Sequence, residues 1–371
     1  MRITLQPKPR GIALIIVMLM MVTFMMLAGG FAYSMKVETK LARNASMDAE
    51  LEWLGRSGVE RAKWILAQKC EPVDALNQIW AGGGGSLCES NGPLAGTSLK
   101  EEYELGRGRF SVKIVDLERK FNINTIRPDN RGPLEQALTL MNIDAAEGSR
   151  IVNAILDWMD PDDQTQIGST DTESRYYLSL DPPHEAKNGP IDDLTELMRI
   201  NGITPAMFYG SGGDVTYSRS MPRLPGLGHG TLEEPTYPIG FKDLFTTLST
   251  GRLNINTANT DTLRLLHRDF PPPILDVDDM VANAVVSERA GLDGVEGTED
   301  DMPYLSVDQV NRALMKVGRP ELTPLFMQYG DVRSSTFEVH VTAQIDNYKR
   351  EYVCILRREG GRLLSLFLYW K

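Results

Sequence analysis

Residues 8–36 read KPRGIALIIVMLMMVTFMMLAGGFAYSMK, and this stretch decides the architecture of the chain. A short basic leader ends at Gly11, and no charged residue follows until Lys36. The 25 uncharged positions from Gly11 to Met35 reach about 37 Å at about 1.5 Å per helical residue, which exceeds the roughly 30 Å hydrocarbon core of a bilayer. The stretch therefore predicts a single membrane-spanning helix over residues 12–34.

The charges around this helix predict its orientation. Arg2, Lys8 and Arg10 precede it, so the positive-inside rule places the N-terminus in the cytoplasm and the rest of the chain across the membrane. A secretory signal peptide is the alternative, and residues 27–32 contain a loose small-residue cleavage site. The long apolar run and the helical pattern that continues beyond it favour an anchor.

The helical pattern continues to about Lys69, with apolar and charged residues at amphipathic spacing. The apolar positions are Val37, Leu41, Ala45, Leu51, Leu54, Val59, Ala62, Ile65 and Leu66. Strands are expected at Arg109–Asp116 and at Phe337–Ile345, where apolar and polar residues alternate. Turns at Asp346-Asn347 and Gly360-Gly361 divide the C-terminus into three strands. One strand thus precedes the middle of the chain and three follow it, which predicts an insertion over residues 126–330.

The middle of the chain contains an internal repeat. Phe121–Thr125 reads FNINT and Leu253–Thr257 reads LNINT. Each copy is followed later by a short helix pattern and a Thr-Pro helix start, at Thr204-Pro205 and at Thr323-Pro324. The sequence therefore predicts two related helical units, at about residues 122–210 and 254–330.

The leader and the apolar helix resemble those of type IV prepilins, which a prepilin peptidase cuts after the glycine. The resemblance implies processing between Gly11 and Ile12. Most pilin-like chains have Glu as the fifth mature residue, where this chain has Ile16. In those proteins the Glu pairs with a neighbouring subunit in the filament, because an unpaired charge in apolar surroundings is costly. Its absence, the length of the chain and the inserted units resemble the protein K family of type II secretion systems, whose members sit at the tip of the filament.

The resemblance implies an α+β fold in which a long pilin-like N-terminal helix packs on an antiparallel sheet that carries a large inserted all-α domain. The two inserted units are similar to the sterile-alpha-motif-like and helix-hairpin-helix units of that family. The expected parts of the chain are a leader (1–11), the membrane helix (12–34), the stem with the first strands (35–125), the inserted domain (126–330) and the returning strands (331–371).

An acidic segment follows the first helix pattern of the insertion. Four carboxylates within seven residues repel one another unless a cation lies among them, and calcium takes hard oxygen ligands of this kind. The spacing is not that of an EF-hand, but it resembles a calcium-binding pattern of the protein K family. Carried over, Asp160, Asp162 and Glu173 are the strongest ligand candidates. The further candidates are Asp157, Asp163, Asp171, Asp192 and Asp193. A solvated acidic loop with Asp192 as a helix cap is the alternative.

Charge and cysteines narrow the function further. The chain carries 39 basic and 50 acidic side chains, a balance that repels phosphate backbones and argues against nucleic-acid binding. Cys70 and Cys88 flank a glycine-rich loop, so a disulfide between them is expected in an oxidising compartment, with two free thiols as the alternative. The acidic residues at 276–279 and 293–301 suit a solvated surface better than a metal site. The four histidines are far apart in sequence, and no zinc site or catalytic triad is indicated.

The resemblance implies a non-enzymatic minor pseudopilin of a type II secretion system, which caps the tip of the pseudopilus and helps to initiate its assembly for protein export. It would be anchored in the inner membrane with its body in the periplasm. The expected partners are the I- and J-type minor pseudopilins, the major pseudopilin, prepilin peptidase and secreted cargo. Two alternatives remain open. One is a minor pilin of a type IV pilus or competence system, and the other is a calcium-dependent membrane-anchored extracytoplasmic enzyme.

Overall fold

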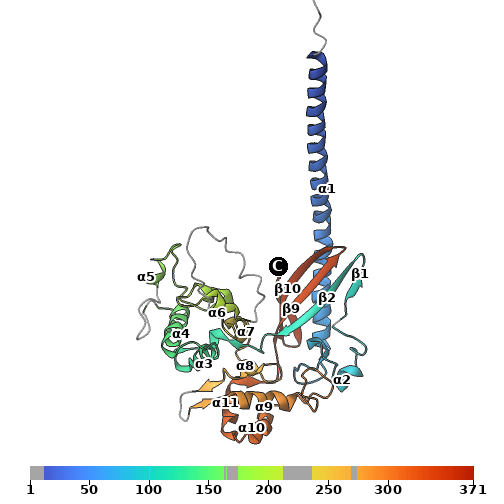
Figure 1. Cartoon of the computed structure of the whole chain (residues 1–371). Helices are drawn as coiled ribbons and strands as arrows, with labels where there is room; N and C mark the ends of the chain where they lie inside the picture. Colours follow the sequence, from blue (N-terminus) through green and yellow to red (C-terminus); the bar gives the residue numbers. More distant parts are fainter. Residues whose placement is uncertain (1–11, 100, 163, 165–173, 212–235, 269–273) are drawn as a thin grey trace, which may run out of the picture.

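The computed structural model describes residues 12–99, 101–162, 164, 174–211, 236–268 and 274–371. Its parts are a long helix, a five-stranded sheet that packs on the end of this helix, and a helical insertion beside the sheet (Figure 1). The predicted pilin-like fold class is confirmed by these elements.

Helix α1 (Ile12–Ala67) is continuous over 56 residues. Its first half projects away from the body (Figure 1), and its side chains there are exposed. Its second half buries Leu51, Leu54 and other apolar side chains against the sheet. Gly55 and Gly58 lie where the helix comes closest to the sheet, because a Cβ atom there would collide with Tyr352 or Val341.

The sheet has the order β1-β2-β9-β10-β11, and all its neighbouring strands are antiparallel. The bounds are β1 Tyr103–Leu105, β2 Gly108–Asp116, β9 Thr336–Ile345, β10 Tyr348–Glu359 and β11 Arg362–Trp370. The predicted alternation in β9 is confirmed, since Phe337, Val339 and Val341 are fully buried while the residues between them are half-buried. This buried face and α1 enclose one hydrophobic core.

The loop between α1 and β1 carries two short helices, η1 (Ile79–Ala81) and α2 (Leu87–Ser90). Ser86 caps α2, and Glu89 accepts hydrogen bonds from the backbone N–H groups of Ile79 and Ser86. The structure joins Cys70 to Cys88 across this loop, with 6.2 Å between their Cα atoms, and Cys354 is a buried free thiol in β10.

The insertion leaves the sheet after Asp116 and returns at Thr336, so it begins earlier than the predicted residue 126. Its first unit contains β3 (Phe121–Asn122), α3 (Gly132–Leu140), α4 (Ala145–Met159), α5 (Ser174–Tyr177), α6 (Pro205–Tyr209), α7 (Phe241–Leu244) and β4 (Phe245–Thr246), with the 3₁₀ helices η2 (Ile123–Thr125), η3 (Pro128–Asn130) and η4 (Leu194–Arg199). Its second unit contains β5 (Leu253–Asn254), α8 (Thr260–Leu263), β6 (His267–Arg268), β7 (Leu275–Asp276), α9 (Asp279–Arg289), α10 (Asn311–Lys316), α11 (Thr323–Tyr329) and β8 (Gly330–Asp331), with η6 (Val307–Val310) and η7 (Pro320–Leu322).

Each unit is closed by a short parallel pair of strands. In the first unit β3 pairs with β4, and in the second unit β5 pairs with β8. The first unit therefore extends to Thr246, beyond the predicted end near residue 210. The insertion is mostly helical but also holds these short strands, and it has a hydrophobic core of its own.

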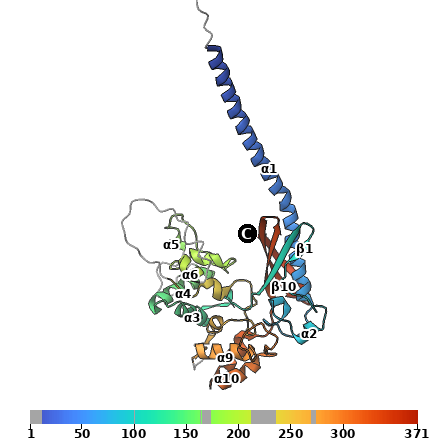
Figure 2. The same cartoon turned by 45° about the vertical axis from the view of Figure 1, so that its right-hand side comes forward.

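The two units differ in their placement. The first unit lies beside the sheet, and the second unit lies at the end of the body that is far from the N-terminal half of α1; both views agree on this (Figure 1, Figure 2). The second unit is thus the part of the described chain that lies furthest from the predicted membrane.

Candidate functional site

The anchor is the first functional feature of the chain. Helix α1 is the one described helix that is long and apolar enough to cross a membrane, and its most apolar window is not buried in the body. Ile16 is half exposed on this segment. The predicted processing residue Ile12 begins the helix, whereas Gly11 lies outside the described residues.

A buried polar junction joins the stem, the sheet and the second inserted unit. Asp74 follows the end of α1 and is fully buried. Its carboxylate accepts hydrogen bonds from Lys69 Nζ (2.6 Å), from the guanidinium of Arg358 (3.0 Å) and from the backbone N–H of Ser334 (2.9 Å). A buried carboxylate needs such partners, since an uncompensated charge away from water is costly.

Two further acids lie at this junction, at the end of β2. Ser334 donates its hydroxyl hydrogen bond to Asp116 (2.6 Å), and the backbone N–H of Thr336 donates to Glu118 (2.9 Å). Burial raises the pKa of the Asp116 carboxyl, and burial together with the neighbouring Asp116 raises the pKa of Glu118 to about 8. Glu118 therefore keeps at neutral pH a proton that its carboxyl group would release in water.

The repeated FNINT and LNINT segments form the same hydrogen-bonded clamp in both units. In the first, Asn124 Nδ2 donates to the carbonyl oxygen of Ile191 (2.9 Å), and the Ile191 N–H donates back to Asn124 Oδ1 (2.8 Å). In the second, Asn256 makes the same two bonds to Tyr304, at 2.9 and 2.8 Å. The predicted duplication thus extends to individual hydrogen bonds.

The first asparagine of each repeat also has a matching role. Asn122 Oδ1 accepts a hydrogen bond from the N–H of Asn124, and Asn254 Oδ1 accepts one from the N–H of Asn256, each at 2.9 Å. Asn254 additionally donates through Nδ2 to the Ser334 hydroxyl (2.7 Å). The second repeat is therefore built directly into the buried junction.

The predicted metal ligands lie around the C-terminal end of α4. Asp157 is fully buried in its last turn, and Asp160 is its half-buried C-terminal cap. Asp162 is exposed, and its Oδ1 accepts a hydrogen bond from the N–H of Gln164 (2.9 Å). The other candidates in this loop, Asp163, Asp171 and Glu173, lie outside the described residues.

The remaining two candidates have other partners. Asp192 pairs with Lys187 Nζ at 2.6 Å, and Asp193 caps η4 together with Glu196 in a capping box. The cap of η4 is therefore Asp193, one residue after the Asp192 that the alternative prediction named as the cap. Among the described residues, no three His, Cys, Asp or Glu side chains gather closely enough to hold a metal ion.

The second acidic set serves the local structure of the second unit. Asp278 caps α9 and accepts a hydrogen bond from Arg319 (3.1 Å), and Asp300 accepts bonds from the N–H groups of Leu292 and Asp293. Arg289 is buried, donates to the carbonyl oxygens of Ile255 and Ala258 and pairs with Glu296. Through its bonds to Ile255 and Ala258, Arg289 holds the repeat segment against α9.

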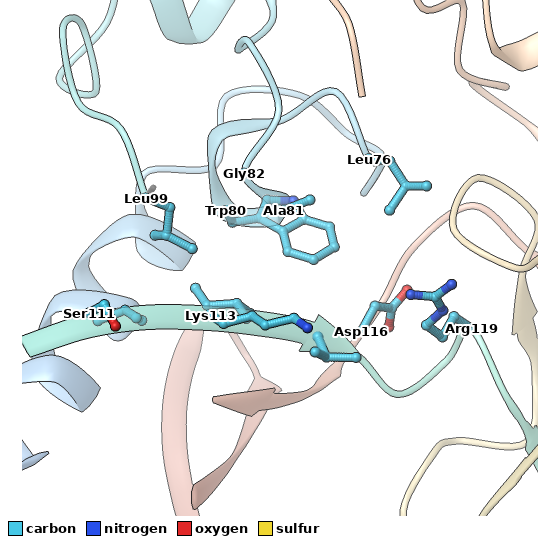
Figure 3. A pocket seen from close by; sticks show the side chains of 12 residues that line it. Leu76, Trp80, Ala81, Gly82, Leu99, Ser111, Lys113, Asp116 and Arg119 are labelled. Carbon is cyan, nitrogen blue, oxygen red and sulfur yellow. The ribbon is translucent and has the colours of Figure 1, made fainter. Parts of the chain in front are cut away.

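A cavity of about 420 Å³ lies along β2. Leu76, Trp80 and Leu99 from the loop between α1 and β1 cover it, and Lys113, Asp116 and Arg119 lie along its floor and end (Figure 3). Its lining is mixed, with charged groups toward the buried junction and apolar groups toward the disulfide-linked loop.

The comparisons with known proteins agree with this architecture. A family model described as type II secretion system protein K matches residues 119–209, which include the first inserted unit up to α6. The chain is 22% identical over 370 residues to the type II secretion system protein K of Klebsiella pneumoniae, covering 95% of this chain and 94% of that protein. It is 22% identical to the protein of the same name from Aeromonas hydrophila, covering 53% of this chain and 60% of that one.

A solved structure extends the likeness to three dimensions. A chain from the crystal structure of the GspK-GspI-GspJ complex of the enterotoxigenic Escherichia coli type 2 secretion system matches with a TM-score of 0.61 at 18% identity, covering 89% of this chain and 99% of that chain. At this identity the likeness concerns the fold. The predicted resemblance to the protein K family is confirmed by the family model and the relatives, and the solved structure confirms the likeness in fold.

Proposed function

We propose that this chain is a minor pseudopilin of a type II secretion system that caps the tip of the pseudopilus and helps to initiate its assembly. The observation that carries the proposal is the insertion between Asp116 and Thr336 in an otherwise pilin-like body. A second subunit stacked above this body would meet the insertion, so the chain suits the end of a filament better than its middle.

The anchor supports the same position. A charged fifth residue in the apolar helix would need a partner from a neighbouring subunit. Ile16 needs none, so this helix can stand at the tip with no subunit above it. The chain is then a single-pass protein of the inner membrane, its body lies in the periplasm, and its partners are the I- and J-type minor pseudopilins and the major pseudopilin.

A deletion of this chain in its own host tests the proposal. We expect loss of protein export through the outer membrane, restored by the wild-type chain. Mass spectrometry of the purified chain should find Ile12 at the mature N-terminus. Unimpaired export in the deletion strain would overturn the role. Export that stays intact while pili or DNA uptake are lost would instead assign the chain to a type IV pilus or competence system.

We also propose that the acidic loop after α4 binds calcium, with Asp160, Asp162 and Glu173 as ligands. The donors are hard carboxylate oxygens, and the C-terminal end of a helix attracts cations because its last carbonyl groups have no partner within the helix. Asp192 and Asp193 are less suited, since Lys187 and η4 hold their carboxylates.

Thermal unfolding of the full chain in detergent tests the metal site. Calcium at a hundred-fold excess over its dissociation constant should stabilise the domain by about 2.7 kcal/mol, and magnesium should act poorly because it demands a tighter octahedral shell. Asp160→Asn with Asp162→Asn should abolish the effect, while the matched control Asp192→Asn should retain it. Coinciding melting curves of the wild-type chain with calcium and with chelator would refute the proposal.

A further inference from the structure

The last strand of the sheet is an unprotected edge. Strand β11 pairs on one side with β10, and its other edge has no backbone partner among the described residues. Residues 363–370 read LLSLFLYW, and the nearest charged residues stand at the two ends, Arg362 and Lys371. Natural edge strands are usually shortened, charged or interrupted by proline, because an exposed apolar edge pairs readily with another strand.

Both faces of β11 are apolar and exposed. Phe367 is 55% exposed and lies opposite Ile355, on the face of the sheet that points away from α1. Trp370 is 63% exposed and lies opposite Tyr352, on the face that packs against α1. The other large hydrophobic side chains that are exposed on this strand are Leu364, Leu366, Leu368 and Tyr369.

The two-sided exposure identifies the kind of partner. A helix or a membrane surface covers one face of a sheet and leaves the edge hydrogen bonds unmade. An added strand pairs with the open edge, and its own side chains extend both apolar faces. The geometry of β11 therefore suits a strand.

Strand β11 is also linked to the stem helix α1 through Arg350. The guanidinium of Arg350 lies 4.7 Å from the centre of the Trp370 ring and pairs with Asp48 of α1 at 2.9 Å. A subunit that packs its own stem helix beside α1 thus brings its body next to β11. We propose that β11 receives an edge strand of a second pilin-like subunit, which joins the sheet of this chain while its stem lies beside α1. This inference rests on the proposed function and names the surface through which a partner pseudopilin binds.

A second copy of this chain does not fit through the simplest symmetric pairing. Two β11 strands paired antiparallel are related by a two-fold axis perpendicular to the sheet. This axis reverses the direction of α1, which lies along the sheet (Figure 1). The two anchors would then point in opposite directions and could not enter one membrane. This pairing is therefore excluded, and the partner that we infer is a different pilin-like chain whose stem runs in the same direction as α1.

Binding of the full chain in detergent to the purified I- and J-type minor pseudopilins of the same system tests the inference. Phe367→Lys combined with Tyr369→Lys changes two exposed side chains on one face, so the fold should be retained. We expect the variant to bind at least about tenfold more weakly, as loss of a central aromatic pair does. Leu105→Lys is the matched control, since Leu105 is 51% exposed on β1 at the opposite end of the sheet.

Hydrogen exchange of the complex distinguishes strand pairing from mere contact. The amides of residues 363–370 should become protected together with one extended segment of the partner. Protection confined to α1, or unchanged affinity of the double variant, would overturn the inference while leaving the proposed function intact. A wild-type chain that binds neither minor pseudopilin would count against the proposed function itself. Self-association through β11 in the absence of partners would identify a second copy as the occupant and also overturn the inference.

Discussion

Asn256→Ala should strongly destabilise the second unit, because it removes both hydrogen bonds between Asn256 and Tyr304. The N–H and the carbonyl group of Tyr304 lose their partner, and Tyr304 is fully buried. A buried polar group left without a partner costs about 1–3 kcal/mol, so the two together should cost about 2–6 kcal/mol. The loss should fall on the second unit, where Tyr304 also donates a hydrogen bond to the carbonyl oxygen of Val285.

Asn124→Ala is the matched variant in the first unit. It removes the same two bonds, but Asn124 is half-buried, so water can replace part of what is lost. We expect a cost of about 1–2 kcal/mol for this variant. Asn283→Ala serves as a control on the exposed face of α9 and should change stability by less than about 0.5 kcal/mol.

The measurement is hydrogen exchange of the full chain under native conditions, which reports the opening free energy of each unit separately. A single melting temperature would be ambiguous, because the sheet and the insertion have separate cores. The reasoning is refuted if Asn256→Ala leaves the opening free energy of residues 253–331 within about 0.5 kcal/mol of wild type, or if Asn124→Ala is the more damaging of the two.

Three further predictions concern the junction and the stem. Burial raises the pKa of Glu118 to about 8, so between about pH 4.5 and pH 8 the folded chain keeps a proton that the unfolded chain has lost, and stability should fall as the pH rises through this range. The melting temperature should depend less steeply on pH in Glu118→Gln than in the wild-type chain, and equal slopes would contradict the assignment. Arg358→Met leaves the buried Asp74 with a weaker set of partners and should destabilise the body by about 3–5 kcal/mol in denaturant unfolding, whereas Arg362→Met on the exposed strand should have little effect. Gly58→Ala places a methyl group against Val341 and should cost about 1–3 kcal/mol by the same assay, while Gly29→Ala, which meets no atom within 4 Å, should leave the body unchanged.

The sequence alone predicted the elements whose signals are local. The apolar run and the amphipathic spacing gave α1, and the alternation of Phe337–Ile345 gave the buried face of β9. The repeated Asn-x-Asn-Thr segments predicted the duplication, and the second asparagine of each repeat, Asn124 or Asn256, makes its two paired hydrogen bonds within its own unit. The closing strand β4 was missed, since its pairing with β3 joins residues more than a hundred positions apart.

The buried junction was missed for the same reason. Asp74 and Arg358 are 284 residues apart, and nothing in either segment indicates the other. One signal was available at Asp116, which continues the buried alternation of Phe110, Val112 and Ile114 and so had to point into the core. Likewise the spacing of Asp193 and Glu196 is that of a capping box, which could have removed Asp193 from the ligand candidates.

The junction explains how a stem and a distal unit can act as one body. Asp74 stands just beyond α1, and its partners include Lys69 from the end of the stem and Ser334 from the segment that returns to the sheet. Ser334 in turn accepts a hydrogen bond from Asn254 of the second repeat. A displacement of the stem along its axis therefore reaches the second unit through buried hydrogen bonds, of which those to the Asp74 carboxylate are charge-assisted and stronger than neutral ones. In the proposed role at the filament tip, the stem helix α1 is pushed from the membrane side, and the buried junction connects it to the second unit, which lies furthest from the membrane.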